Sequence, residues 1–392
     1  MTTAKNNEHK KLNFSNEQEQ SQACLNSAEH EKNQGRKVLN VPNLRFKEFQ
    51  GEWEKKRLEE CVEFLDGLRK PIKSEDRKSE QGLYPYYGAS GIIDYIDGYI
   101  FDGEYILLSE DGANIIDRNY RVAFIAKGKI WVNNHAHVLQ PYDGFDINFL
   151  SETLERLNYA VYNTGTTMPK LNQEVCRNIN LKIPTTKEQN KIGNLLSLLN
   201  ERISTQNKII DKLQSLIKGI GKQLFMDNQN WRTVKIGELL RIGNGKDYKH
   251  LSIGKIPVYG TGGQMLLVND YLYDGESVCI GRKGTIDTPM FLKGKFWTVD
   301  TLFYTYDFKD VLPKFCYYLF LQINWKLYNE GTGVPSLSKS TIENIKVKIP
   351  SLEQQHKICS ILDCYEHKTN NEEQILELYH SEKQYLLRQM FI

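Results

Sequence analysis

The sequence predicts an α+β protein built from two copies of one domain that are joined by long helices. Three observations lead to this prediction: the chain length, a long-range internal repeat, and a coiled-coil pattern at the end of each copy. At 392 residues the chain is longer than one hydrophobic core usually serves, since a domain averages about 150 residues. Hydrophobic residues make up 40% of the chain, which is enough for more than one packed core.

The internal repeat is the most informative feature. Residues 162–225 align without gaps with residues 328–391, and 19 of the 64 pairs are identical, far more than chance would give. Upstream the match continues with small length changes, so one copy spans about 53–225 and the other about 231–391. A period this long indicates duplication of a whole domain with its trailing segment, because solenoid repeats are much shorter.

Short motifs recur in the front part of each copy. The Lys-Gly-Lys-x-Trp segment at 127–131 recurs at 293–297, and the Asp-Gly-Glu segment at 102–104 recurs at 274–276. This part is rich in Tyr, Ile, Val and Phe and is interrupted by clusters of Gly. Such a pattern predicts short strands with tight turns and some helix.

Each copy ends in a predicted helix. From Ile192 onward, apolar residues recur with the four-three spacing of a coiled coil, and Gln206 is the one polar residue in that register. In the second copy Thr369, Glu372 and Lys383 interrupt the same seam, so we expect the second helix to need the first as its partner. An antiparallel pair would relate the two domains by an approximate two-fold axis. The alternative is two separately buried amphipathic helices.

The expected boundaries follow from the repeat. A polar segment rich in Asn, Gln, Glu, Lys and Ser opens the chain and is predicted to be a disordered tail. The predicted parts are the tail at 1–40, the first domain at 41–185, the first spacer helix at 186–226, the second domain at 227–350 and the second spacer helix at 351–392.

Composition and motif searches exclude several classes of protein. No apolar run approaches the ~20 residues of a membrane helix, and the start of the chain lacks a secretory signal, so we expect a cytoplasmic location. Phosphate-loop, dinucleotide-binding, nucleophile-elbow and His-Glu-x-x-His motifs are absent. The chain has no Pro-Pro pair, which the Asn/Asp-Pro-Pro-aromatic motif of amino-methyltransferases requires. We therefore expect no catalytic residues.

Two histidines could bind a metal. His135 and His137 would lie on one face of a strand, but a site needs a third ligand and the nearby sequence offers none. We therefore expect no metal here. A polar surface or a contact with DNA bases is the alternative role for these two histidines.

The glycine-rich turns are candidate DNA contacts. The segment at 281–285, Gly-Arg-Lys-Gly-Thr, offers two cations and a hydroxyl where glycines allow close backbone approach, which suits phosphates and guanine edges. The first copy has Ser-Glu-Asp-Gly at 109–112 instead, and Asn-Asn-His at 133–135 faces Val-Asp-Thr at 299–301. Such divergence on a shared scaffold is expected of two modules that bind different sequences. A solvated hairpin turn is the alternative.

Together these features resemble the specificity subunit of type I restriction-modification enzymes. The resemblance rests on the duplication, on the Gly-Thr-x-x-Pro-x-Leu element at 165–171 and its repeat at 331–337, and on Ile-Pro followed by Gln-x-x-Ile at both helix starts. The segment from Leu44 to Trp53 is also similar to that family. The resemblance covers about residues 41–392. The long polar N-terminal extension departs from it and has no assigned role.

The resemblance implies two target-recognition domains, each contacting half of a bipartite, interrupted DNA site. It also implies that the paired helices set the gap and dock two methyltransferase subunits, with restriction subunits joining through that core. S-adenosylmethionine, ATP and Mg would then bind the partner subunits and not this chain, which would be the non-catalytic part of an adenine methyltransferase and endonuclease complex for defence against phage.

Candidate residues follow from the turns and from the outer helix positions. The candidate DNA contacts are Lys70, Tyr87, Ser90, Ser109, Asn133, Asn134, His135, Thr166, Lys170, Lys246, Tyr259, Thr261, Arg282, Lys283, Thr285, Thr301, Thr332 and Ser336. The candidate partner-docking residues are Leu195, Ile209 and Leu216. Two alternatives stay open: a stand-alone regulator of an inverted DNA site, and an intact methyltransferase or nuclease with an unrecognised site.

Overall fold

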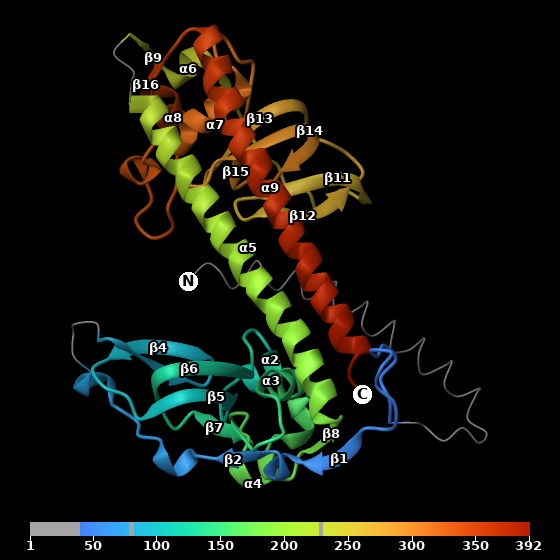
Figure 1. The fold of residues 1–392 in the computed structure, drawn as a ribbon. Coiled ribbons are helices and arrows are strands. Elements are labelled where there is room, and N and C mark those ends of the chain that lie inside the picture. The colour runs from blue at the N-terminus through green and yellow to red at the C-terminus, as the bar shows by residue number, and fades with distance from the viewer. Residues whose placement is uncertain (1–39, 78–81, 227–229) are drawn as a thin grey trace. The chain divides into compact units, whose positions relative to one another are not determined.

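A computed structural model of the chain describes residues 40–77, 82–226 and 230–392 (Figure 1). The predicted N-terminal tail lies outside the described residues apart from its last position. The described chain forms two compact units. Among the described residues, the first unit comprises those from 40 to 208 together with 374–392, and the second unit comprises those from 209 to 373.

The first unit contains a six-stranded mixed sheet with the strand order β2-β7-β5-β6-β3-β4 (Figure 1). Neighbouring strands are antiparallel except β3 and β6, which are parallel. The strands are β2 (Val62–Phe64), β3 (Tyr84–Gly88), β4 (Gly91–Ile96), β5 (Phe101–Ser109), β6 (Ala123–Val132) and β7 (Ala136–Pro141). A separate antiparallel pair joins β1 (Glu54–Arg57) to β8 (Asn180–Ile183).

The second unit repeats this topology. Its six-stranded sheet has the order β10-β15-β13-β14-β11-β12, with β11 and β14 parallel. The strands are β10 (Arg241–Asn244), β11 (Ile253–Gly260), β12 (Gly263–Val268), β13 (Tyr273–Gly281), β14 (Met290–Thr298) and β15 (Leu302–Tyr306), and the separate pair is β9 (Arg232–Lys235) with β16 (Lys346–Ile349). The prediction of an α+β fold with two repeated domains is therefore confirmed.

Short helices surround each sheet. In the first unit these are η1 (Leu58–Glu60), η2 (Asp66–Leu68), η3 (Ser74–Asp76), α2 (Asn114–Asp117), α3 (Ile147–Glu155), η4 (Tyr159–Tyr162) and α4 (Gln173–Arg177). In the second unit they are α6 (Ile236–Leu239), α7 (Pro313–Gln322), η5 (Trp325–Tyr328) and α8 (Lys339–Asn344).

Two long helices, α5 (Thr186–Met226) and α9 (Leu352–Gln389), contribute to both units. In the first unit Leu196 near the start of α5 shares a hydrophobic core with Leu386 near the end of α9. In the second unit Leu224 near the end of α5 shares a core with Leu362 near the start of α9. Because opposite ends meet in each unit, the two helices run antiparallel, as expected for the paired spacer helices. The two-fold relation between the units stays a prediction.

The motif at each helix start is structural. Gln189 is buried and donates to Pro184 O at 2.9 Å, and Gln355 donates in the same way to Pro350 O at 3.1 Å. Each glutamine thus ties the last strand of its domain to the helix that follows. Within the described residues, no helix is long and apolar enough to span a membrane.

Candidate nucleic-acid interface

A turn and a loop meet at the end of the central strand in each unit. We call residues 109–112 and 281–284 the first and second recognition turns, and residues 163–171 and 329–337 the first and second straps. The first turn follows β5 and the second follows β13. Each strap pairs with its turn through an isolated β-bridge, Asp111 with Lys170 and Lys283 with Ser336.

In the first unit, backbone hydrogen bonds fix the turn on both sides. Glu110 N donates to His135 O at 2.9 Å, and Gly112 N donates to Pro169 O at 3.0 Å. From the strap, Leu171 N donates to Glu110 O at 2.7 Å. The turn is therefore held between the strap and the residues that precede β7.

The second unit has the same three backbone bonds. Arg282 N donates to Thr301 O at 2.8 Å, Gly284 N to Pro335 O at 2.9 Å, and Leu337 N to Arg282 O at 2.9 Å. Since the backbone frame is the same, Arg282 occupies the position of Glu110 and Lys283 that of Asp111. The alignment of the two turns by sequence has a physical basis.

The straps explain the Gly-Thr-x-x-Pro-x-Leu element. Asn163 Oδ1 accepts from the backbone N of Gly165 at 2.9 Å and of Lys170 at 2.8 Å, and Asn329 accepts in the same way in the second unit. A Cβ atom on Gly165 would lie 1.8 Å from Met168 O, so the loop requires glycine there. The element builds the strap and does not itself specify a ligand.

The second recognition turn is cationic. Arg282 and Lys283 are exposed, and neither forms an ion pair with any residue that the structure describes. Together with Asn244, Ser336, Lys339 and one acidic residue, Glu330, they line an open cavity of about 390 Å³. Cations and hydroxyls around an open cavity suit a phosphate or the acceptor edge of guanine.

The first recognition turn carries compensated charges. Glu110 forms ion pairs with Arg69 at 2.7 Å and Lys170 at 3.5 Å, and Asp111 lies 2.9 Å from Nδ1 of His135. Because basic side chains lie beside both carboxylates, the turn does not present an unpaired negative charge.

Beneath the first turn lies a buried cluster of ligand-type groups from Asp66, Glu110 and His137. Nδ1 of His137 lies 2.6 Å from Asp66 and Nε2 lies 2.8 Å from the carbonyl oxygen of Leu171. Both ring nitrogens are thus engaged, and Arg69 contacts both carboxylates. This geometry is that of a salt-bridge network. His135, the other histidine considered for a metal, does not belong to the cluster.

The chain was then compared with known proteins. The type I restriction modification DNA specificity domain matches residues 50–215 and 228–378. The chain belongs to this family. A Haemophilus influenzae protein, named provisionally as a type I restriction enzyme specificity subunit, is 30% identical over 352 residues, which are 82% of this chain and 89% of that protein.

Other similar proteins are also type I specificity subunits. A specificity subunit of a type I restriction enzyme from Methanocaldococcus jannaschii is 24% identical and covers 84% of this chain and 92% of its own. The crystal structure of the type I S subunit from M. genitalium has a TM-score of 0.68 at 18% identity and covers 90% of this chain and 99% of its own. At this identity the likeness shows the fold. The family membership favours a non-catalytic specificity subunit over both the stand-alone regulator and the intact enzyme.

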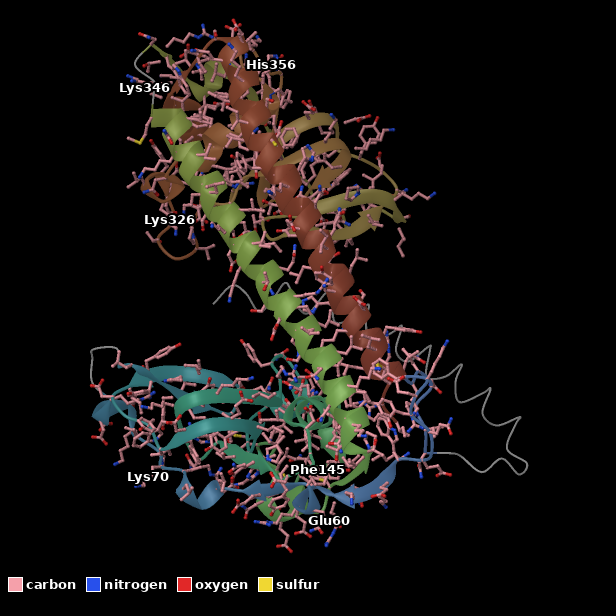
Figure 2. The ribbon with its side chains drawn as sticks, viewed as in Figure 1. Glu60, Lys70, Phe145, Lys326, Lys346 and His356 are labelled. Atoms are coloured by element: carbon pink, nitrogen blue, oxygen red, sulfur yellow. The ribbon has the colours of Figure 1, made fainter. Side chains whose placement is uncertain are left out.

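Most candidate DNA contacts of this specificity subunit are accessible. The exposed ones are Lys70 (labelled in Figure 2), Ser90, Asn134, His135, Thr166, Lys170, Lys246, Arg282, Lys283 and Thr332. The half-buried ones are Tyr87, Tyr259, Thr261, Thr285, Thr301 and Ser336. Burial raises the pKa of Tyr87 and of Tyr259, so both phenols stay neutral donors.

Ser109 and Asn133 are buried, which corrects their assignment as DNA contacts in this conformation. Ser109 Oγ donates to Ala89 O at 2.5 Å, and Asn133 Oδ1 accepts from His135 N at 2.8 Å. Their polar atoms are used to shape the turn. Sequence alone could not separate them from their exposed neighbours.

Lys70 and Lys246 occupy equivalent places. Trp131 Nε1 donates to Lys70 O at 2.6 Å, and Trp297 Nε1 donates to Lys246 O at 2.9 Å. A buried or half-buried tryptophan thus fixes the backbone of each lysine while its side chain stays exposed.

The sequence prediction missed several residues of the interface. Arg69 and Glu110 in the first unit and Asn244 and Lys339 in the second lie beside the candidate contacts. The alignment of Glu110 with Arg282 was a usable signal, but the acidic residue was left out of the candidate set. Nothing in the local sequence of Arg69 indicates its role.

The three docking candidates differ in accessibility. Ile209 is 38% exposed and Leu216 is 43% exposed. Leu195 is half-buried and packs on the core of the first unit, so it is a poor docking residue. Leu198, at 59% exposed, presents more apolar surface and was missed.

Proposed function

We propose that this specificity subunit binds double-stranded DNA with both units, each contacting one half of an interrupted, bipartite site. The observation that carries the proposal is the shared frame of turn and strap, on which the two units display different side chains. A common frame with different exposed groups is what two modules need to bind two different sequences.

In the second unit, the unpaired cations favour contact with DNA. Arg282 and Lys283 extend from a turn whose backbone is fixed, so binding orders their side chains but little of the backbone. Lys246 and Lys339 add positive charge on the same unit. We propose that this turn contacts phosphate, with Arg282 close to base edges, because backbone N–H groups and cations occur together there.

In the first unit, binding would require exchange of ion pairs. Asn134, His135 and Lys170 are exposed beside the acidic turn. Amide, imidazole and carboxylate groups can bond to the amino and acceptor groups of bases in the major groove. We propose that sequence preference in this half-site depends on these groups and that overall affinity depends less on phosphate contacts than in the second half-site.

We further propose that the outer face of the long helices docks two methyltransferase subunits and that restriction subunits join this assembly. A solved structure of 13% identity and TM-score 0.51 has a title on complex assembly of the type I restriction-modification system. On this chain, Ile209 of α5 and Ile375 of α9 are equivalent in the repeat, and each is 38% exposed. An exposed isoleucine retained in both copies supports two equivalent docking sites.

S-adenosylmethionine, ATP and Mg are then expected on the partner subunits, and the assembly is expected in the cytoplasm with the chromosome. The decisive experiment compares adenine methylation across the genome with and without this gene. Loss of methylation at one motif made of two specific halves and an unspecific gap supports the proposal. A motif that is one contiguous tract, or a footprint of that form, refutes it.

A further inference from the structure

Both units carry the same exposed charged hairpin, at the beginning of β5 and of β13. In the first unit Asp102 faces Lys129 and Glu104 faces Lys127 across the β5–β6 pair. In the second unit the same cross-strand pairs recur between β13 and β14. We call these eight residues the charged ladders: Asp102, Glu104, Lys127 and Lys129 in the first, and Asp274, Glu276, Lys293 and Lys295 in the second.

The side-chain geometry of the two ladders is also shared. Lys127 and Glu104 are 3.2 Å apart, and their equivalents in the second unit are 3.0 Å apart. Lys129 Nζ lies 4.7 Å from the ring centroid of Tyr99, and Lys295 Nζ lies 4.7 Å from that of Tyr271. Both tyrosines are 42% exposed. Each ladder therefore ends in an exposed tyrosine covered by a lysine.

The needs of folding explain the glycine and the tryptophan of the Lys-Gly-Lys-x-Trp segments but not the charged residues of the ladders. Gly128 and Gly294 have φ values of +80° and +85°, which favour glycine, and the tryptophans at the end of the motif hold the backbone of Lys70 and Lys246. The exposed ion pairs add little to the stability of the fold, because solvent screens them. The recognition turns, on the same two sheets, have diverged between the copies, whereas the ladders have not. Five exposed or half-buried polar side chains that stay identical thus indicate a ligand common to both units.

The ladders are distant from the recognition turns. Ser109 follows Asp102 by seven residues of one strand, which places the turn about 23 Å away along β5. Each ladder contains two lysines and two acids, so its charge is balanced. Phosphate binding needs an excess of cations, whereas exposed tyrosines are enriched at protein interfaces and balanced charges beside them can steer and orient a protein partner.

We propose that each charged ladder docks one copy of the same protein partner, the methyltransferase subunit, in addition to its contact with the helices. This inference rests on the proposed function, because it names a second surface for the same partner. Two equivalent ladders give two equivalent contacts, one for each copy. On this proposal, the divergent recognition turns contact DNA and the identical charged ladders bind the methyltransferase subunit.

The test uses the full chain co-expressed with the methyltransferase subunit of its system and measures the stoichiometry by native mass spectrometry. Lys127→Glu with Lys129→Glu should remove one copy of the partner, Lys293→Glu with Lys295→Glu should remove one copy, and the four changes together should remove both. Lys55→Glu and Lys255→Glu are matched controls, since both lysines are exposed on strands and lie outside the ladders. These controls should retain both copies.

A charge swap separates docking from folding. Glu104→Lys with Lys127→Glu keeps an internal ion pair but reverses its direction, so a purely structural role predicts normal assembly, whereas docking predicts loss of one copy. Full assembly of the swap and of the four-residue variant would overturn the inference. Normal assembly with weaker DNA binding would assign the ladders to DNA instead and would equally overturn it. Failure of the unmodified chain to bind any methyltransferase would contradict the proposed function itself.

Discussion

Nδ1 of His137 lies 2.6 Å from a carboxylate oxygen of Asp66, and the histidine is 1% exposed. Its Nε2 lies 2.8 Å from Leu171 O, a carbonyl that can only accept, so Nε2 carries a proton. Burial lowers the pKa of His137, but its hydrogen bonds to Asp66 and Cys176 outweigh this effect and raise the pKa to about 10. The imidazolium therefore joins η2, β7 and the first strap beneath the recognition turn.

This ion pair predicts a specific pH dependence of stability. In the unfolded chain the pKa of a histidine is about 6.5, so the pair contributes fully below about pH 6.5 and is lost as the pH rises through about 10. We expect His137→Gln to lower the free energy of unfolding by about 2 kcal/mol at pH 6.5, because it removes the closer of the two cations that contact the Asp66 carboxylate, while Arg69 remains. Urea unfolding of both proteins at several pH values measures the difference.

The difference between the two proteins should shrink between pH 6.5 and 10, since only the unmodified protein loses this cation there. His135→Gln is the matched control, because His135 is half exposed and should change stability little. A difference that stays constant across this range would show that His137 is neutral in the folded protein.

Arg282→Ala should weaken DNA binding through the loss of a phosphate contact. Arg282 is exposed on a fixed turn and has no ion-pair partner among the described residues, so it is free to meet the backbone of DNA. We expect lower affinity for all sequences and a fall of about one in the slope of log K against log salt. Fluorescence anisotropy at several salt concentrations measures both.

Lys309→Ala, which removes an exposed cation beyond the far end of β15, serves as the control and should leave the slope unchanged. If Arg282 instead contacts a base, its loss should cost about 1 to 3 kcal/mol and relax specificity in one half-site. Unchanged affinity, slope and specificity would show that the turn faces solvent.

The recognition turns illustrate what the sequence could predict. The alignment of Gly281–Gly284 with Ser109–Gly112 predicts equivalent turns in both units, and the structure gives these turns one backbone frame. Exposure within the turn could not be predicted. Ser109 lies one residue from Glu110, yet its hydroxyl points inward to Ala89 O, and only the pairing of strands decides which way it points.

Ile209→Asp should release the methyltransferase from the helices. Its side chain is 38% exposed on α5, so a charge there removes apolar contact with a partner at little cost to the fold. Lys212→Asp, a nearby exposed change on the same helix, is the control and should retain the complex. Size-exclusion chromatography with light scattering of the co-expressed subunits gives the composition.

Retained assembly of the Ile209→Asp variant would place docking elsewhere on the chain. Leu195→Asp is less informative, because Leu195 packs on the core of the first unit and a charge there would also unfold it.

The coiled-coil seam shows a second limit of sequence interpretation. Lys383 breaks the apolar register and was expected to weaken the second helix. Its Nζ lies 3.1 Å from Glu152 Oε1, which also accepts from Arg121 at 2.9 Å and Asn200 at 3.0 Å. A periodic pattern depends only on spacing along one helix. The charge of Lys383 is paired with Glu152 of α3, which lies 231 positions away in the sequence.

This network yields the last prediction. Burial raises the pKa of Glu152, but Arg121 and Lys383 outweigh it and hold the pKa below its usual value. Burial also lowers the pKa of Lys383, so the lysine depends on its partner. We expect Glu152→Leu to lower the free energy of unfolding by about 3 kcal/mol, because it leaves a buried cation unpaired. The double variant Glu152→Leu with Lys383→Met should recover the part of this loss that is due to Lys383, since replacing both members of a buried pair by apolar groups is often neutral. Arg121 and Asn200 lose their contact with Glu152 in both variants.

Urea unfolding of the two single variants and the double variant gives the coupling energy between the residues. Hydrogen exchange over residues 374–389 locates the effect, because Lys383 anchors this part of α9 to the first unit. We expect faster exchange there in Glu152→Leu and near-normal exchange in the double variant. Additive losses of stability, with no recovery in the double variant, would show that the ion pair does not hold the helix and that packing of Leu386 and its neighbours suffices.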